Sequence, residues 1–534
     1  MQSPGDRPDE TSTARERGLR WVWIAVAILP FQLPLLHHLW SAGPLATGFL
    51  GYDTPYYVAN GRAVFEHGNG FFSPNPYDSD PTSPAIYFHL FTWLLGLGVK
   101  VFGVDPGFLF AGVGLVASFI GGALTLRLVE AVLPERRGRL PLFVLTMWSG
   151  GMLCFGALVV SWSEGRLTPA DWFGLDLPNG WWFPNWGRNF ILSHEAFYHL
   201  FAAATWLGVV LRRWPLAFGA LGVLAACHPF SGIQHLLIVG AWVGILALRE
   251  RTLAAWGRVL VVGAMLAIFA AYYFLYLDSF PGHRAVRDHW LAGWQLPLST
   301  VMLGILPPVG IAAWKIWRQR GRLGERDGFF LTAGLVTLLL MKHDWFLAPH
   351  QPAHFSRGYN WLPFWLIALP QLQTWSRELA SLRPRILAGV IVTLGVAGLF
   401  FDNAVFTVRE WKHGEVENEH LTLPQREALA WMDRAKLRGV LLCADARLSY
   451  LSATYSGVRP YLGHLQNTPN VIRHGRDVAG WQRRGETGEW FRLIDYVLID
   501  RHDPPAAFDS SPWRELYRNE DYILLGRVDS IGGK

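Results

Sequence analysis

Apolar runs long enough to cross a membrane alternate with polar connections along most of the chain. A helix needs roughly 20 mostly apolar residues to span a bilayer. The pattern predicts eleven such helices, at about residues 21–41, 108–132, 140–160, 193–211, 214–229, 231–248, 256–277, 298–316, 328–346, 361–375 and 386–406. We therefore predict a mainly α-helical, polytopic membrane protein.

The connections between these runs are of two kinds. Every second one is short and rich in arginine, which is typical of loops held in the cytoplasm. The others are longer and rich in Trp, Pro, Gly and His, and we expect them outside: 42–107, 161–192, a turn near His228, 278–297, 347–360 and the tail from 407. The N-terminal tail, 1–20, is then cytoplasmic. This alternation requires that the apolar stretch 85–103 does not cross, so we predict a helix lying in the outer interface there.

The pattern changes after about residue 407 to short strands that alternate with helices. A charged helix at 424–437 precedes an apolar strand at 439–445, a helix-like segment at 448–457, a strand at 493–501 and a strand pair within 513–528. Such alternation favours an α/β unit. We therefore predict a transmembrane domain over 21–406 and a small extracytoplasmic α/β domain over 407–534.

Composition supports a membrane protein and excludes some partners. The chain is 51% hydrophobic and 16% charged, whereas soluble proteins carry about 25% charged residues. The formal charge of +6 lies in short clusters between apolar runs. Because no basic stripe is interleaved with aromatics, we predict no nucleic-acid partner. Three cysteines, two of them inside apolar runs, supply neither a disulfide framework nor a CxxC metal site.

The first outer connection carries the most information about function. Asp53 comes just beyond the first apolar run, and a helix-compatible segment with Tyr56 and Tyr57 follows it. The full order is Asp53, Tyr56, Tyr57, Glu66, His67, Gly68, Pro84, Phe102 and Gly103. It resembles the GT-C superfamily of membrane glycosyltransferases, which includes protein O-mannosyltransferases, oligosaccharyltransferases and the lipid A aminoarabinose transferase. The resemblance covers about residues 20–140 and is architectural beyond them.

This resemblance implies a glycosyltransferase of the bacterial inner (plasma) membrane. The implied donor is a polyprenyl-phosphate-linked sugar, and the implied acceptor is a glycan, a lipid or a protein outside the cytoplasm. An acceptor hydroxyl that attacks the anomeric carbon must lose its proton, and a carboxylate within hydrogen-bond reach takes it. Asp53 is therefore our candidate base, with Tyr56 and Tyr57 as substrate contacts.

The leaving group departs as a phosphate monoester and needs cationic stabilisation. Arg357 is the first candidate for that contact, and Arg284 and Arg287 are the next, because all three lie in outer connections. Asp171, in the connection 161–192, is a further substrate-binding candidate. That connection also offers Glu164 and Asp176 but lacks the paired acids of the oligosaccharyltransferases. The second acid and the need for a divalent cation therefore stay open.

Simpler interpretations compete with these roles. An Asp at the mouth of a span is commonly a solvated loop residue or a helix cap, and arginines near the surface reach to lipid headgroups. His194-Glu195-x-x-x-His199 resembles a zinc motif, but the extra residue places its histidines about 140° apart around a helix. We therefore name no metal ligands and reject a zinc protease. For His228 and His235 we expect structural hydrogen bonding or substrate contact rather than metal.

Two functions of other classes remain as alternatives. A transporter or flippase for a lipid-linked or small polar substrate predicts ionisable residues at mid-bilayer and broken helices repeated in the two halves. The sequence shows few such charges and no repeat, which favours an enzyme. A scaffold that only displays the tail does not explain why polar and aromatic residues gather in the other outer connections.

Overall fold

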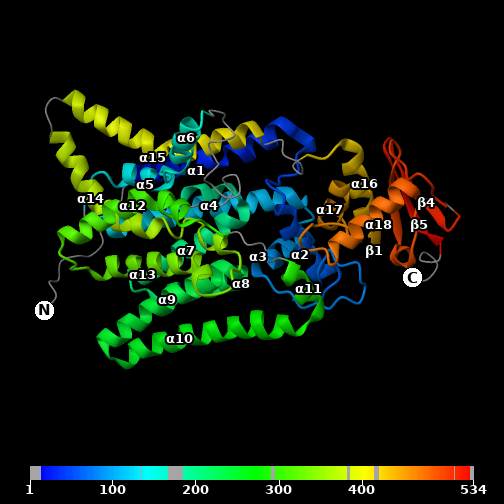
Figure 1. Cartoon of the computed structure of the whole chain (residues 1–534), viewed down its shortest axis with the longest axis horizontal. Helices are drawn as coiled ribbons and strands as arrows, with labels where there is room; N and C mark the ends of the chain where they lie inside the picture. The colour runs from blue at the N-terminus through cyan, green and yellow to red at the C-terminus, as the bar shows by residue number, and fades with distance from the viewer. Residues whose placement is uncertain are drawn as a thin grey trace.

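Helices make up most of the chain in the computed structural model, which describes residues 14–133, 135–165, 185–289, 295–381, 385–413, 420–509 and 511–528. Long helices run side by side in a bundle, and a small sheet with its own helices lies beyond one end of that bundle (Figure 1). Two helices of the first long connection, α2 (Thr54–Glu66) and α3 (Leu90–Phe102), lie near the junction. The predicted class, mainly α with a C-terminal sheet, is confirmed.

Every predicted span falls on a helix or on a bent pair of helices. The bundle helices are α1 (Ala14–Ala42), α4 (Pro106–Val132), α5 (Arg139–Trp148), α6 (Leu153–Ser163), α7 (Ser193–Val210), α8 (Trp214–Cys227), α9 (Pro229–Glu250), α10 (Leu253–Ala270), α12 (Leu298–Arg318), α13 (Glu325–Met341), α14 (Leu362–Ser381) and α15 (Arg385–His413). Among the described residues, six helices are long and apolar enough to cross a membrane, and the α5–α6 pair makes a seventh if it is one span. The 14 residues of α8 reach only about 21 Å, against a bilayer core of about 30 Å. The count of eleven is therefore not confirmed.

The predicted span 140–160 is broken at its centre, with a bend of 48° between α5 and α6. A side chain at Gly151 would lie 2.3 Å from the carbonyl oxygen of Gly304, so the chain passes α12 too closely for anything but glycine. The break leaves N–H groups at the start of α6 without helical partners. Asp402 of α15 accepts hydrogen bonds from Leu153 and Cys154 at 3.0 and 3.1 Å, and so caps α6 from outside the helix.

The arginine-rich connections gather at one end of the bundle. Arg212 pairs with Glu325 and Glu250 and so joins three of these connections, and Arg377 pairs with Glu135 and joins two others. Arg212 follows the C-terminal end of α7, whereas the N-terminal end of α7 lies beside the site described below. The predicted grouping of the connections is confirmed. Which end faces the cytoplasm stays a prediction.

The helices α2 and α3 cross at a pair of glycines. A Cβ added to Gly96 would lie 2.0 Å from the carbonyl oxygen of Gly61, and one added to Gly61 would lie 2.3 Å from the carbonyl oxygen of Thr92. Because backbone cannot give way as a side chain does, both positions require glycine. A helix is thus present within 85–103, as α3, and is packed directly on α2. Its place in the membrane interface stays a prediction.

We expect Gly96→Ala to destabilise the protein by about 1–3 kcal/mol, the usual cost of overpacking, because the new methyl group pushes α3 away from α2. Thermal unfolding in detergent measures this effect. Gly112→Ala in α4 is the matched control, since nothing lies within 4 Å of its Cβ position. Equal midpoints for the two variants would contradict the close crossing.

The C-terminal sheet has five strands in the order β2-β1-β3-β5-β4. The strands are β1 (Gly439–Cys443), β2 (Val458–Pro460), β3 (Tyr496–Asp500), β4 (Trp513–Arg518) and β5 (Tyr522–Arg527). The second strand in this order, β1, pairs in parallel with β2 and β3, while β3 with β5 and β4 with β5 are antiparallel. Three helices accompany the sheet: α16 (Leu423–Arg434), α17 (Ala446–Tyr455) and α18 (Val471–Arg484). The predicted strands and the two predicted helices are confirmed, whereas β2 and α18 were not predicted.

This C-terminal unit is docked on α2 by charged and polar contacts. Arg62 of α2 binds both Glu66 of the same helix, at 2.7 Å, and Asp433 of α16. The imidazole of His67, at the end of α2, lies 2.8 Å from the carbonyl oxygen of Gly457. The first long connection and the C-terminal sheet thus meet over the full length of α2.

Candidate active site at the start of α2

Asp53 stands at the N-terminus of α2 but does not cap it. Its carboxylate makes no hydrogen bond to the first turn of the helix. Instead, Oδ1 lies 3.1 Å from Nε2 of His464, which follows β2 in the C-terminal unit. The Asp53 side chain is 60% exposed and the His464 side chain only 1%. The helix-cap interpretation is therefore wrong, because another part of the chain holds this carboxylate.

The surroundings of Asp53 keep it ionised. The surrounding protein desolvates the carboxyl and so raises its pKa, but the hydrogen bond from His464 and the nearby imidazoles of His194 and His354 outweigh that effect and lower the pKa below its ordinary value of 3.8. The carboxylate oxygens are reachable from solvent, although protein surrounds the rest of the residue. An ionised, accessible carboxylate can accept a proton at neutral pH.

Tyr56 and Tyr57 point in two directions from Asp53. The ring of Tyr56 lies 5.3 Å from that of His464, on the side of the C-terminal unit. The ring of Tyr57 stacks on His194 at the start of α7, with centroids 4.5 Å apart. Burial raises the pKa of Tyr56 to about 12, so its hydroxyl is neutral. The two adjacent rings connect the Asp53–His464 pair with the bundle.

Arg357 lies in the bundle beneath these rings, in the segment before α14. The residue is 6% exposed, and its Nη1 forms an ion pair with Glu195 in the first turn of α7. Its Nη2 donates to Nδ1 of His354 at 2.6 Å. Burial lowers the pKa of His354 to about 3, which leaves the neutral ring able to accept this bond. Arg357 is thus a buried guanidinium with a carboxylate partner.

A series of contacts joins these groups into one site. The rings of Tyr56 and Tyr57 lie 5.7 Å apart, Tyr57 stacks on His194, and Nε2 of His194 lies 3.5 Å from Oε1 of Glu195, the partner of Arg357. Burial lowers the pKa of Arg357, and the charge of Asp53 acts in the opposite direction. Besides burial, both charges also act on the pKa of Tyr57, which Arg357 lowers and Asp53 raises. The structure therefore brings together four of the predicted residues: Asp53, Tyr56, Tyr57 and Arg357.

The other predicted residues lie elsewhere. Arg287 pairs with Asp278 and Asp288, and Arg284 donates to the carbonyl oxygen of Asp278, all around the short helix α11 (Pro281–His289). In the described part of the chain, these hydrogen bonds keep both arginines on residues 278–288, away from Asp53. Asp171 and Asp176 lie outside the described residues, and Glu164 is exposed after α6.

Sequence reasoning missed Glu195, His354 and His464 as members of the site. Glu195 lies in the His-Glu-x-x-x-His segment, whose histidines we expected not to share a metal ion. In the structure that segment places His194 against Tyr57 and Glu195 against Arg357. In the described part of the chain, no group of three or more His, Cys, Asp or Glu could hold a metal ion.

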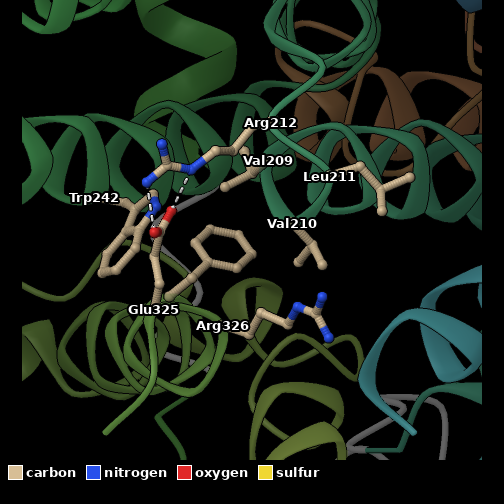
Figure 2. Close-up of a pocket in the computed structure, with 8 residues that line it drawn as sticks. Val209, Val210, Leu211, Arg212, Trp242, Glu325 and Arg326 are labelled. Carbon is tan, nitrogen blue, oxygen red and sulfur yellow. Dashed lines mark hydrogen bonds and ion pairs between the residues drawn. The ribbon is translucent and has the colours of Figure 1, made fainter. Parts of the chain in front are cut away.

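A pocket of about 360 Å³ lies at the opposite end of α7. Figure 2 shows the ion pair of Arg212 and Glu325 across it, with Nε to Oε1 at 2.9 Å. It is lined by Val209, Val210, Leu211, Arg212, Trp242, Glu325, Arg326 and Phe329. None of the predicted site residues lines this pocket, which belongs to the arginine-rich end.

Fold and site together define a polytopic membrane protein, and its fold is shared with a solved membrane-protein structure. The structure of ArnT, an aminoarabinose transferase, from Cupriavidus metallidurans in the apo state matches with a TM-score of 0.50 and 15% identity, over 98% of this chain and 100% of that one. ArnT bound to undecaprenyl phosphate gives 0.48 and 14%, over 97% and 99%. The Archaeoglobus fulgidus oligosaccharyltransferase in complex with Zn and sulfate gives 0.43 and 11%, over 90% and 68%. No family model and no curated protein matches the sequence. At these identities the likeness concerns the fold.

Proposed function

We propose that the chain is a glycosyltransferase that moves a sugar from a polyprenyl-phosphate-linked donor to an acceptor on the extracytoplasmic face of the membrane. The observation that carries the proposal is the accessible carboxylate of Asp53 at the junction of bundle and C-terminal unit. It is held by His464 and linked through the contacts of Tyr56, Tyr57, His194 and Glu195 to the buried guanidinium of Arg357. The GT-C fold supports the proposal, because transfer from a lipid-linked donor needs a site that both the bilayer and the aqueous phase can reach.

In this mechanism Asp53 accepts the proton of the acceptor hydroxyl as its oxygen attacks the anomeric carbon. The bond from that carbon to the phosphate oxygen breaks, and the lipid leaves as a phosphate monoester. Developing negative charge on that oxygen is stabilised by fixed donors. Arg357 is the proposed donor. A guanidinium has five N–H groups, so Arg357 can bind phosphate while it stays paired with Glu195. Tyr56 and Tyr57 form the wall between base and cation.

The proposed orientation follows from the two ends of the bundle. The arginine-rich end faces the cytoplasm, and the site and the C-terminal unit from about residue 407 lie outside, in a bacterial inner membrane. The acceptor then arrives from the aqueous phase, and the donor arrives from the bilayer.

Purified protein in liposomes tests this function with a panel of undecaprenyl-phosphate monosaccharides and an envelope extract as acceptor. We expect release of undecaprenyl phosphate with at least one sugar, and none from protein-free liposomes. Movement of an intact donor across the bilayer without release would overturn the proposal in favour of a flippase.

A further inference from the structure

We infer that the C-terminal unit completes the active site by supplying His464 as a positioning residue for Asp53. This inference rests on the proposed function and assigns a task to a part of the chain for which the sequence suggested none. His464 and Asp53 are separated by 411 positions in the sequence. Their contact exists only when the C-terminal unit is docked on α2.

Hydrogen bonds on the far side of the ring fix which nitrogen of His464 carries the proton. The backbone N–H of Gln466 donates to Nδ1 at 3.1 Å, and the amide nitrogen of Asn467 lies 3.0 Å from the same atom. A nitrogen that accepts from a backbone N–H cannot itself be protonated. The proton is therefore on Nε2, which donates to Oδ1 of Asp53. The ring holds the carboxylate with a hydrogen bond and leaves the second carboxylate oxygen for the acceptor.

Tyrosine rings hold the imidazole in place. Their centroids lie 5.0 to 5.7 Å from that of His464, and they are Tyr52, Tyr56, Tyr77 and Tyr450. Tyr450 of α17 stacks on Tyr52 at 4.9 Å and donates its hydroxyl to the carbonyl oxygen of that residue at 2.6 Å. The hydroxyl of Tyr52 accepts from the N–H of Leu465 at 2.8 Å.

The four tyrosines around His464 come from both parts of the chain. Tyr52, Tyr56 and Tyr77 come from the first connection, whereas Tyr450 comes from the C-terminal unit, and Asn75 donates to the carbonyl oxygen of Asn467 at 2.6 Å. Because the ring is 1% exposed and enclosed on several sides, it has little freedom to turn. Such rigid support is what a group that aims a catalytic side chain requires.

The pH dependence of transfer reports this role. The titratable and charged groups that face Asp53 are His464, Tyr52, Tyr56, Tyr57, Tyr450, His194, His354 and Arg357. Of these, only His464 donates a hydrogen bond to the carboxylate among the bonds of the described residues. If that bond is removed, the pKa of Asp53 rises, because the desolvation that raises it is no longer offset by the hydrogen bond from His464. On acidification, a variant without this bond therefore loses transfer at a higher pH than the wild type does.

The pH profile of kcat/KM is measured for wild type, His464→Ala, His464→Gln and His474→Ala. We expect the acid limb of His464→Ala to move up by about 1 to 2 pH units, since a hydrogen bond to a charged group is worth that much. His464→Gln restores the limb, because its amide N–H can donate to Asp53. His474 lies in the same unit and donates from Nδ1 to the carbonyl oxygen of Tyr461 at 2.8 Å, so its variant keeps the wild-type profile. A folded His464→Ala with an unmoved limb would overturn the inference.

A second measurement needs no substrate and separates this inference from the proposed function. Nitrogen-15 NMR of the full-length protein with labelled histidine, assigned through His464→Gln, should show His464 protonated on Nε2. Asp53→Ala should move that Nε2 signal and leave the His474 signals in place. An Nε2 signal insensitive to Asp53→Ala refutes the positioning role. A sensitive signal in a protein that turns over no donor refutes the proposed function alone.

Discussion

Asp53→Asn is expected to lower glycosyl transfer by about 10²- to 10⁴-fold, the usual contribution of a general base. The amide keeps an oxygen that accepts the hydrogen bond from His464, so the fold should survive, but it cannot take a proton from the acceptor hydroxyl. Release of undecaprenyl phosphate, measured with thermal unfolding on the same preparation, separates lost chemistry from lost structure.

A matched control for this variant stands on the same connection. Asp105 caps α4 through bonds to the N–H groups of Gly107 and Phe108 at 2.9 and 3.2 Å and pairs with Arg426. Asp105→Asn should therefore cost some stability and leave transfer close to wild type. If Asp53→Asn retained full transfer, Asp53 would be excluded as the base.

Arg357→Ala is expected to be the most destabilising single change in the site. It leaves the carboxylate of Glu195, which is 4% exposed, without the guanidinium that balances its charge. Removing one partner of a buried ion pair costs about 3–5 kcal/mol. Thermal unfolding measures this loss, and donor turnover is expected to fall with it.

A double variant separates stability from phosphate binding. In Arg357→Ala with Glu195→Gln the buried charge is gone, so most of the lost stability should return. Donor turnover should stay low, because the cation proposed to stabilise the leaving phosphate is still missing. If the double variant regained transfer together with stability, Arg357 would have only a structural role.

Local sequence pattern was sufficient to predict the bundle helices but not the contacts that form the site. Hydrophobic runs predicted every bundle helix, because apolar length is a property of consecutive residues. The runs do not fix the number of spans, because α7, α8, α13 and α14 each fall short in length or hydropathy of what the six longer helices reach. The strand β2 was missed because it has three residues, one of them proline, which is too short for alternation to show.

Asp53 was recognisable from its position after the first apolar run, but its partner was not. His464 lies in a polar loop whose sequence has no periodicity, and only the docking of the C-terminal unit brings it to the carboxylate. Likewise, Arg357 was predicted from its connection, whereas its pairing with Glu195 depends on how α7 packs beside the segment before α14. Contacts between distant segments follow from packing, which a single sequence does not display.

The most direct test is a structure of this protein bound to undecaprenyl phosphate. The account predicts that the phosphate lies within hydrogen-bond distance of Arg357 and faces the Asp53 carboxylate, with His464 still holding Oδ1. A phosphate bound instead beside Arg212 and Arg326 in the pocket of Figure 2, with no lipid near Asp53, would contradict it.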